Sequence, residues 1–269
     1  MHALVLTIPP PPFRDIELGG LTLHGYGLVM GIALVVAIAV CEWGLKQQHV
    51  DASRFTGLAL VSILAGFIGA RLYHVASEPK RFWEAPGDIV KVWEGGLGIY
   101  GAIILGAAVG LWAAPRFGIP RRAVADAAVP AIFFAQAIGR LGNYLNQELF
   151  GRPFTGAWAL EVDPARRPDG YLDSTTFHPT FLYELLGTLA LGVLFLVLVV
   201  RWTSRTPGIL MPLWLVGYSA VRLVVEPMRI DEAHEWLGVR QNVWVAGVLL
   251  ATGLVAAALM RRRDPSRRP

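Results

Sequence analysis

The sequence predicts an all-α, polytopic integral membrane protein with about seven transmembrane helices and a small extracytoplasmic cap. Of its 269 residues, 54% are hydrophobic and only 16% are charged, whereas a soluble domain carries about 25% charged residues. Lipid is therefore expected to surround much of the chain. About 20 apolar residues are needed for a helix to cross a bilayer. Seven stretches approach that length: 21–43, 56–76, 96–115, 124–146, 180–201, 208–227 and 241–260.

The first three stretches carry polar residues at the ends that are expected to lie on the same side of the membrane. The first opens with His24 and Tyr26. The second carries Arg71 near its far end, and the third opens with Tyr100. Because successive spans run in opposite directions, these residues are expected to lie near one level of the membrane.

The next three stretches repeat this placement. The fourth and sixth are the least apolar, since they contain Arg140 and Arg222, and the fifth opens with His178 and Glu184. Arg71, Arg140 and Arg222 lie roughly 14–16 residues into their spans, which at about 1.5 Å per residue is about 21–24 Å across a core of about 30 Å. The common polar level is therefore expected in the outer third, and the seventh stretch returns the chain to the inner side.

Basic residues favour a cytoplasmic C-terminus. Seven spans place the two chain ends on opposite sides, and more basic residues fall on the C-terminal side than on the other. Cytoplasmic loops are the ones enriched in Lys and Arg, so the N-terminus is expected outside. The basic residues of the C-terminal tail are Arg261, Arg262, Arg263, Arg267 and Arg268.

The loops and composition predict a single membrane-embedded domain, 1–269. In this orientation the longer loops, about 77–95 and 147–179, lie outside, and the prolines and glycines of 147–179 predict a small extracytoplasmic cap. The net charge of +4 collects in loops and at the tail, so no nucleic-acid binding is expected. Cys41 is the only cysteine, which rules out an intrachain disulfide and a cysteine metal site.

Charged groups at membrane depth cost about 2.5–3.5 kcal/mol each, and they normally face a protein interior and serve a function. Residues that share a helix face with an arginine are Gln136 and Asn143 on the fourth stretch and Tyr218, Glu226 and Arg229 on the sixth. Glu226 is expected to pair with Arg222 or Arg229, and such pairing alone would also suit a purely structural role. Guanidinium forks from separate helices suit a phosphate, so the residues predict an outer-leaflet phospholipid site and leave its use open.

Segment 139–151 carries a family resemblance. It reads Gly-Arg-Leu-Gly-Asn-Tyr-Leu-Asn-Gln-Glu-Leu-Phe-Gly and resembles the signature of prolipoprotein diacylglyceryl transferases, Gly-Arg-x-Gly/Ala-Asn-Phe-x-Asn-x-Glu-x-x-Gly. The one departure is Tyr144, where the family usually has Phe. Further segments that resemble family motifs in the same order are 24–27, 69–72, 178–184 and 218–231. The resemblance covers about 20–260 and implies seven spans with the N-terminus outside.

The resemblance implies a reaction in the bacterial cytoplasmic (inner) membrane, with the active site towards the outer leaflet. The diacylglyceryl group of phosphatidylglycerol moves to the lipobox cysteine thiol of a prolipoprotein, just behind its signal peptide. The products are a thioether and glycerol phosphate, and the step is the first of bacterial lipoprotein maturation. The expected partners are therefore phosphatidylglycerol, the prolipoprotein and membrane lipids, and no metal or soluble cofactor is implied.

The resemblance also implies roles for residues of this sequence. Arg140 and Arg222 would bind the phosphate, Tyr26 and Tyr218 would orient the headgroup or acceptor, and the cap would help receive the precursor. The expected catalytic residues are Arg140, Arg222, Tyr100, Tyr26, Asn143 and Glu148. The expected substrate-binding residues are Arg140, Arg222, Asn143, Asn146, Gly151, Tyr218, Glu226, Arg229, His24, His178 and Arg71.

Tyr100 marks a departure from the family. Many members carry a histidine at this place, and it has been proposed as the base. The acceptor thiol, with a pKa near 8.5, must become a thiolate, and a tyrosine with a pKa near 10 is a poor base. We hypothesise that the arginines acidify the thiol and that Tyr100 positions it, with His24 and His178 as alternative bases.

Two other readings compete with the transferase. A phospholipid transporter or flippase would also hold a headgroup at an outer-leaflet site, but it favours a site near the midplane and an internal repeat, and this sequence shows no repeat. A non-catalytic scaffold would use its arginine–glutamate pairs as structural glue.

Overall fold

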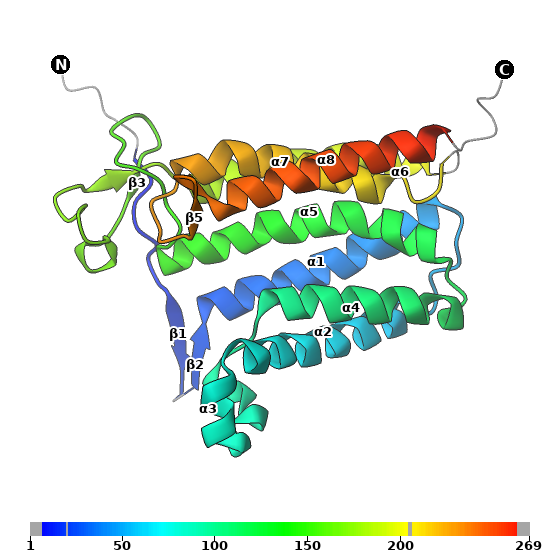
Figure 1. The fold of residues 1–269 in the computed structure, drawn as a ribbon, viewed down its shortest axis with the longest axis horizontal. Coiled ribbons are helices and arrows are strands. Elements are labelled where there is room, and N and C mark those ends of the chain that lie inside the picture. The colour runs from blue at the N-terminus through cyan, green and yellow to red at the C-terminus, as the bar shows by residue number, and fades with distance from the viewer. Residues whose placement is uncertain (1–6, 20, 204–205, 263–269) are drawn as a thin grey trace. The chain divides into compact units, whose positions relative to one another are not determined.

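The computed structural model describes residues 7–19, 21–203 and 206–262, most of them in helices (Figure 1). Of the basic tail, Arg263, Arg267 and Arg268 lie outside the described residues. Within these described residues, six helices are long and apolar enough to cross a membrane, so the chain is a multi-pass membrane protein. They are α1 (Gly25–Gln47), α2 (Phe55–Ser77), α4 with the 3-10 turn η3 (Ile99–Phe117), α5 (Arg121–Asn146), α6 (Thr180–Trp202) and α8 (Gln241–Arg262).

The sixth predicted stretch forms a shorter helix, α7 (Leu210–Val225), which has 16 residues and continues into the 3-10 turn η5 (Glu226–Met228). The carboxylate of Asp126, from α5, holds the chain where α7 begins. Its oxygens accept hydrogen bonds from the main-chain N–H groups of Gly208 at 2.5 Å and Leu210 at 2.9 Å. Helix starts leave such N–H groups without partners inside the helix, so Asp126 fixes the position of α7.

The chain divides into two compact units. One comprises Met1–Gly44 and Asp126–Pro269, and the other comprises Leu45–Ala125. In the first unit, side chains of α5 and α6 pack with the start of α7 and with α8 in one apolar core. Its buried members are Val129, Phe133, Phe195, Val199, Ile209, Leu210 and Ala257.

The predicted cap segment, 147–179, carries an apolar core of its own in the first unit. Strand β3 (Leu160–Glu161) pairs antiparallel with β4 (Thr176–Phe177), and the 3-10 turn η4 (Pro164–Arg166) lies between them. The buried residues beneath this sheet are Phe150, Leu160, Val162, Phe177 and Phe181. Because Phe181 belongs to α6, the cap is anchored on the helices rather than tethered as a free loop.

Two further hairpins border the first unit's helices. Strand β1 (Asp15–Leu18) pairs with β2 (Leu21–His24) directly before α1. Strand β5 (Glu235–Trp236) pairs with β6 (Val239–Arg240) directly before α8. The first predicted span was therefore placed too early: residues 21–24 are apolar enough to extend a helix, but they form the second strand of a hairpin.

The second unit is built on a glycine-lined crossing of α2 and α4. A methyl group on Gly101 would lie 2.0 Å from the main-chain oxygen of Gly69, and one on Gly69 would lie 2.3 Å from the oxygen of Gly101. Small residues let helix backbones approach this closely in membranes. The chain segment that connects α2 to α4 forms α3 (Pro79–Glu84) and the 3-10 turns η1 (Pro86–Val90) and η2 (Val92–Glu94).

The third predicted span also began too early, at 96. Gly95 and Gly96 have φ values of 88° and 75°, a left-handed conformation that a helix cannot contain. Helix α4 accordingly begins at Ile99.

Candidate functional site

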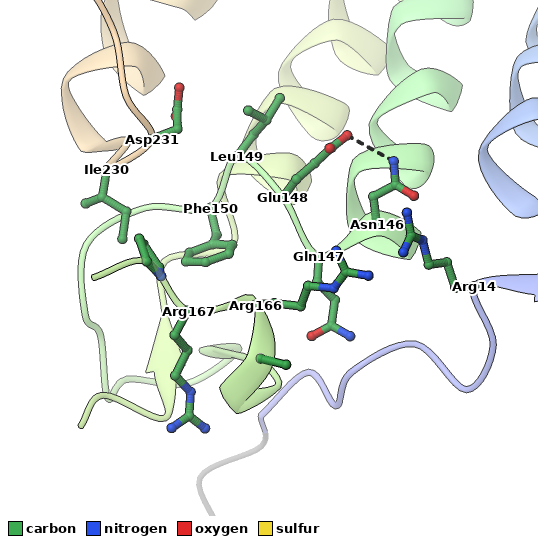
Figure 2. Close-up of a pocket in the computed structure, with 12 residues that line it drawn as sticks. Arg14, Asn146, Gln147, Glu148, Leu149, Phe150, Arg166, Arg167, Ile230 and Asp231 are labelled. Atoms are coloured by element: carbon green, nitrogen blue, oxygen red, sulfur yellow. Dashed lines mark hydrogen bonds between the residues drawn. The ribbon is translucent and has the colours of Figure 1, made fainter. Parts of the chain in front are cut away.

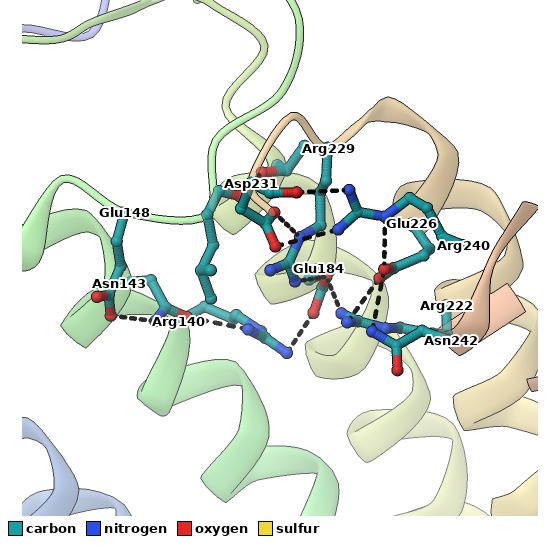
Figure 3. Close-up of polar contacts among 12 residues, drawn as sticks. Arg140, Asn143, Glu148, Glu184, Arg222, Glu226, Arg229, Asp231, Arg240 and Asn242 are labelled. Carbon is teal, nitrogen blue, oxygen red and sulfur yellow. Dashed lines mark hydrogen bonds and ion pairs between the residues drawn. The ribbon is translucent and has the colours of Figure 1, made fainter. Parts of the chain in front are cut away.

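A network of arginines and carboxylates lies in the first unit, below the cap (Figure 3). Its members come from α5, α6, the end of α7 and the segment between α7 and α8, which are far apart in sequence. The arginines are Arg140, Arg222, Arg229 and Arg240, and the carboxylates that touch them are Glu184, Glu226 and Asp231.

Glu184 lies at the centre of this network. It sits on the first turns of α6 and is only 4% exposed. One carboxylate oxygen pairs with the guanidinium of Arg140, and the other accepts a hydrogen bond from Nη1 of Arg222 at 2.8 Å. Nη1 of Arg229 lies 4.0 Å from the same oxygen. Two arginines from different helices therefore bind the same carboxylate group.

Glu226 anchors the inner side of the network. Its side chain is completely buried, and Nη2 of Arg222 lies 2.6 Å from one of its oxygens. The other oxygen accepts hydrogen bonds from Nε of Arg240 at 2.9 Å and from Nδ2 of Asn242 at 3.0 Å. The predicted pairing of Glu226 with Arg222 is thus confirmed, and Arg240 joins it from β6.

Asp231 joins Arg229 and Arg240 at another edge of the network. It accepts hydrogen bonds from Nε of Arg229 at 2.7 Å and from Nη2 of Arg240 at 3.0 Å. Burial acts to raise the pKa of Asp231, but the hydrogen bond from Arg229 and the two positive charges outweigh it and hold the pKa below its ordinary value. Asp231 is therefore ionised at neutral pH and fixes both arginines.

A polar arm extends from Arg140 along the end of α5. Nη1 of Arg140 donates to Oδ1 of Asn143 at 2.9 Å, and Nδ2 of Asn143 donates to Oε1 of Glu148 at 2.8 Å. Asn146 donates to the same oxygen of Glu148 at 3.3 Å. The residues of the signature segment therefore act as one hydrogen-bonded set.

The network as a whole is close to neutral. Its four arginines face Glu184, Glu226 and Asp231 directly, and Glu148 is joined to Arg140 through Asn143. Buried charges are tolerated only when they are paired and hydrogen-bonded. Balance among these eight groups explains how so many charges remain within the protein.

Two glycines bring neighbouring segments against this network. A methyl group on Gly142 would lie 2.7 Å from Cδ2 of Tyr26, so the α1 tyrosine packs directly on α5 beside Asn143. A methyl group on Gly151 would lie 2.9 Å from the main-chain oxygen of Met228 and 2.8 Å from Cβ of His178. Gly151 thus lets the cap's first residues dock on the segment that carries Arg229.

A pocket of about 400 Å³ lies between cap residues and the polar arm (Figure 2). Glu148 and Asn146 line it, and Asp231 lies on its wall. Arg14 and Arg166 also line it, and within the part of the chain that the structure describes no side-chain hydrogen bond or ion pair engages either guanidinium. The pocket therefore adjoins the arginine network through Glu148 and Asp231.

The remaining predicted residues of the first unit lie in different settings. His178 stacks on Phe154 with ring centroids 4.1 Å apart, and its Nδ1 lies 3.1 Å from the hydroxyl of Tyr183. Burial, aided by the charge of Arg152, lowers the pKa of His178. His24 is exposed and lies 2.9 Å from Asp15 across the first hairpin.

Tyr218 lies on α7 one turn before Arg222 and stacks on Trp214 with ring centroids 5.9 Å apart. The network consequently brings together Arg140, Asn143, Asn146, Glu148, Arg222, Glu226 and Arg229, with Gly151 and Tyr26 packed against it. Among the described residues, no hydrogen bond or ion pair joins the side chain of His24, His178 or Tyr218 to this network, although Cβ of His178 lies against Gly151.

Arg71 and Tyr100 belong to the second unit. Arg71 is 8% exposed, and its guanidinium makes five hydrogen bonds, as many as it has N–H groups. The acceptors are the main-chain oxygens of Asp88, Ile89, Lys91, Gly95 and Gly96. Tyr100 lies four residues after Gly96, and its ring packs on that of Tyr73 at a centroid distance of 5.7 Å. That Arg71 also touches a substrate stays a prediction.

Sequence reasoning had not assigned Glu184, Arg240, Asp231 or Asn242 to the site. Glu184 and Asp231 were noted within segments that resemble family motifs, 178–184 and 218–231, but neither was given a role, and Arg240 was counted only among the basic residues of the loops. Helical spacing identifies neighbours on one helix, whereas these residues meet the arginines across helices. In the described part of the chain, no group of three or more His, Cys, Asp or Glu side chains could hold a metal ion.

Comparison with known proteins relates the whole chain to one family. The family model described as prolipoprotein diacylglyceryl transferase matches residues 15–259. A phosphatidylglycerol–prolipoprotein diacylglyceryl transferase of Frankia alni is 42% identical over 97% of this chain and 70% of its own length. A second such protein, from Streptomyces coelicolor, is 42% identical over 94% and 80%. One from Cutibacterium acnes is 41% identical over 96% and 88%.

Proposed function

The chain belongs to the prolipoprotein diacylglyceryl transferase family, and on that premise we propose that it is a phosphatidylglycerol–prolipoprotein diacylglyceryl transferase. It moves the diacylglyceryl group of phosphatidylglycerol to the lipobox cysteine thiol of a prolipoprotein. The products are a thioether and glycerol phosphate. The reaction is the first step of bacterial lipoprotein maturation.

The convergence of Arg140 and Arg222 on one carboxylate carries this proposal. The two guanidinium groups come from α5 and α7, yet each binds a different oxygen of Glu184. Guanidinium forks match the geometry of carboxylate and phosphate alike and keep their charge when desolvated. The site is therefore suited to hold the phosphodiester of a lipid headgroup between two helices.

In the proposed reaction, the cysteine thiolate attacks the glyceryl carbon that bears the phosphate ester oxygen. The new carbon–sulfur bond forms as the carbon–oxygen bond breaks, and its electron pair stays on the phosphate. Negative charge on the phosphate increases in the transition state. Arg140 and Arg222 stabilise that charge more strongly in the transition state than in the bound lipid, which is how positioned cations accelerate a reaction.

The neighbouring residues position these two arginines and the substrates. Asn143, Asn146 and Glu148 hold Arg140 at the end of α5. Glu226 holds Arg222, and Arg229 lies 4.0 Å from Glu184. We assign Tyr26 and Tyr218 to orientation of the headgroup or acceptor. The cap at 147–179, docked through Gly151, and the pocket beneath it would receive the precursor peptide.

Tyr100 and Arg71 are assigned positioning roles. Tyr100 would hold the arriving thiol by a hydrogen bond, and Arg71 would fix the segment that leads into α4. Tyr100→Phe is then expected to keep measurable activity, because the hydroxyl does not accept the proton. His24 and His178 stay proposed as substrate-binding residues and as alternative bases. Loss of all transfer in Tyr100→Phe with normal lipid binding would make its hydroxyl an obligatory participant.

We further propose the placement of the protein in the membrane. Helix α7 would act as a seventh span with its continuation η5, so that the N-terminus lies outside and the C-terminus in the cytoplasm. The basic tail supports that orientation. The whole chain would form one domain of the bacterial cytoplasmic membrane, with its site towards the outer leaflet, where phosphatidylglycerol and the translocated precursor meet.

A transfer assay tests the function. Purified protein is incubated with phosphatidylglycerol labelled in its acyl chains and a lipobox peptide, and label on the peptide thiol is measured. We expect transfer by the wild type and none by Arg140→Ala, since alanine removes the fork on the phosphate. Arg121→Ala is the matched control, because Arg121 lies at the opposite end of the same helix and its Nε donates to a main-chain oxygen.

The same assay separates the alternatives. Movement of lipid between leaflets without label on the peptide would indicate a flippase. No transfer and no lipid movement by folded protein would indicate a scaffold. Near-normal turnover by Arg140→Ala would remove Arg140 from the site.

A further inference from the structure

The acceptor thiol must lose a proton, and Tyr100 is not proposed to accept it. We propose that Glu184 occupies the position of the lipid phosphate in the lipid-free site and, once the phosphate displaces it, accepts the proton of the thiol. This rests on the proposed function and names a catalytic residue for it.

The contacts of Glu184 resemble those expected of the phosphate itself. Its two oxygens bind Arg140 and Arg222 separately, with Arg229 at 4.0 Å as a third cation (Figure 3). A phosphodiester also presents two charged oxygens on one atom. Since guanidinium forks bind either anion in the same way, the lipid phosphate and the Glu184 carboxylate compete for one place.

The other acidic groups of the network keep their partners when the phosphate enters. Glu226 is fully buried and held by Arg222, Arg240 and Asn242. Asp231 accepts its hydrogen bonds from Nε of Arg229 and from Arg240, which leaves Nη1 of Arg229 for the phosphate. Among the described residues, the Glu184 carboxylate is bonded only to the guanidinium groups that the phosphate would take. Glu184 is therefore the carboxylate that lipid binding releases.

Charge balance gives the released carboxylate its role. The four arginines are matched by Glu148, Glu184, Glu226 and Asp231, and a phosphodiester adds one negative charge. An uncompensated charge in a site of low dielectric constant is unfavourable. A carboxylate that has lost its cations is a stronger proton acceptor, which favours transfer of the thiol proton to Glu184. The negative charge passes to the sulfur and then to the leaving phosphate, where Arg140 and Arg222 compensate it.

The step is balanced. The S–H proton passes to a carboxylate oxygen of Glu184, and the sulfur forms a bond to the glyceryl carbon. The bond from that carbon to the phosphate ester oxygen breaks, and glycerol phosphate leaves as a dianion. Loss of the proton to water returns Glu184 to Arg140 and Arg222, which helps to release the product.

Glu184→Gln separates this role from a structural one. Glutamine keeps the shape but loses the charge and the basic oxygen, so the lipid has a weaker competitor and the thiol has no acceptor. We expect phosphatidylglycerol, titrated calorimetrically into the variant in mixed micelles, to bind at least about threefold more tightly. We expect kcat to fall by about 10²- to 10⁴-fold, the usual contribution of a general base, and the acidic limb of the kcat profile to disappear.

Glu226→Gln is the matched control, since Glu226 binds Arg222 but not Arg140. It should weaken lipid binding, because it loosens the arginines without removing a competitor. If Glu184→Gln also weakens lipid binding, or if its kcat stays within about tenfold of wild type, the proposal is wrong. Should Glu184→Gln fail to fold, Glu184→Asp serves instead: its retracted carboxylate should lower kcat and keep the acidic limb, and an unchanged kcat would overturn the proposal.

The binding arm does not depend on the proposed function. If wild-type protein transfers no lipid to a thiol, the transferase assignment fails, yet tighter lipid binding by Glu184→Gln would still show that Glu184 fills the phosphate's place. If the wild type transfers lipid and Glu184→Gln does so at the normal rate, the transferase assignment stands and Glu184 is not the proton acceptor.

Discussion

Replacement of Arg71 by methionine tests whether this arginine holds the fold of the second unit or binds substrate. Methionine replaces the apolar stem of arginine but has no donor, so it removes all five hydrogen bonds to the main-chain oxygens of residues 88–96. Those oxygens belong to the segment that leads into α4 and Tyr100. We expect the segment to loosen and the unit to lose stability.

The loss follows from the number of bonds. A hydrogen bond to protein contributes about 0.5–1.5 kcal/mol net, and one to a charged group contributes more. Partial rehydration of the freed oxygens offsets part of the loss, so five bonds made by a side chain that is 8% exposed suggest about 3–5 kcal/mol in all. A change of that size lowers the thermal midpoint by on the order of 10 °C in a chain of this length.

The assay is thermal unfolding in detergent, with phosphatidylglycerol affinity measured on the folded protein at low temperature. Arg81→Met is the matched control: Arg81 lies 5.4 Å from the same Phe82 ring as Arg71, but it is half-exposed, and among the described residues its guanidinium pairs only with Glu78, at the surface. Such a pair contributes at most about 1 kcal/mol. An Arg71→Met protein with a normal midpoint and weakened lipid binding would refute the reasoning and return Arg71 to the substrate site.

Three further changes probe the first unit. In Gly151→Ala the new methyl group would lie 2.9 Å from the main-chain oxygen of Met228; the cap should shift at a cost of about 1–3 kcal/mol, seen as faster proteolysis of the cap. Asp126→Ala leaves two main-chain N–H groups at the start of α7 without their acceptor and should lower stability by about 2–4 kcal/mol, whereas an unchanged denaturation midpoint would contradict this. Burial and the charge of Arg152 depress the pKa of His178 in the folded protein. The stability that neutral His178 contributes is therefore complete above the pKa of about 6.5 that histidine has in the unfolded chain, and it declines as pH falls below that value. His178→Gln should flatten this part of the plot of stability against pH.

Much of the helical architecture was predictable because it depends on apolar length. The stretches predicted at 56–76, 180–201 and 241–260 correspond to helices Phe55–Ser77, Thr180–Trp202 and Gln241–Arg262. The starts of the first and third helices were missed for local reasons: a strand pairing at 21–24 and two left-handed glycines at 95 and 96. Neither a short hairpin nor a glycine conformation changes the hydropathy of a segment.

Only those contacts of the site that join residues of one helix could be predicted, because helical spacing in the sequence identifies them. Spacing along the sixth stretch correctly placed Glu226 beside Arg222, and spacing along the fourth placed Asn143 on the face of Arg140. The central position of Glu184 arises where three helices meet, and no periodicity encodes that meeting. A carboxylate one turn into an apolar span, opposite two membrane arginines, was the signal that could have identified it.

The most direct test of the phosphate site is the distance between the phosphorus of bound phosphatidylglycerol and arginine side chains, measured by ³¹P–¹⁵N solid-state NMR on protein labelled in its guanidinium groups. We expect two guanidinium groups within about 4 Å of the phosphorus. Arg140→Lys should abolish the signal of one of these groups, and Arg222→Lys should abolish the signal of the other. Bound lipid whose phosphorus lies far from every arginine, or whose two short distances survive both substitutions, would contradict the assignment of Arg140 and Arg222 to the lipid phosphate.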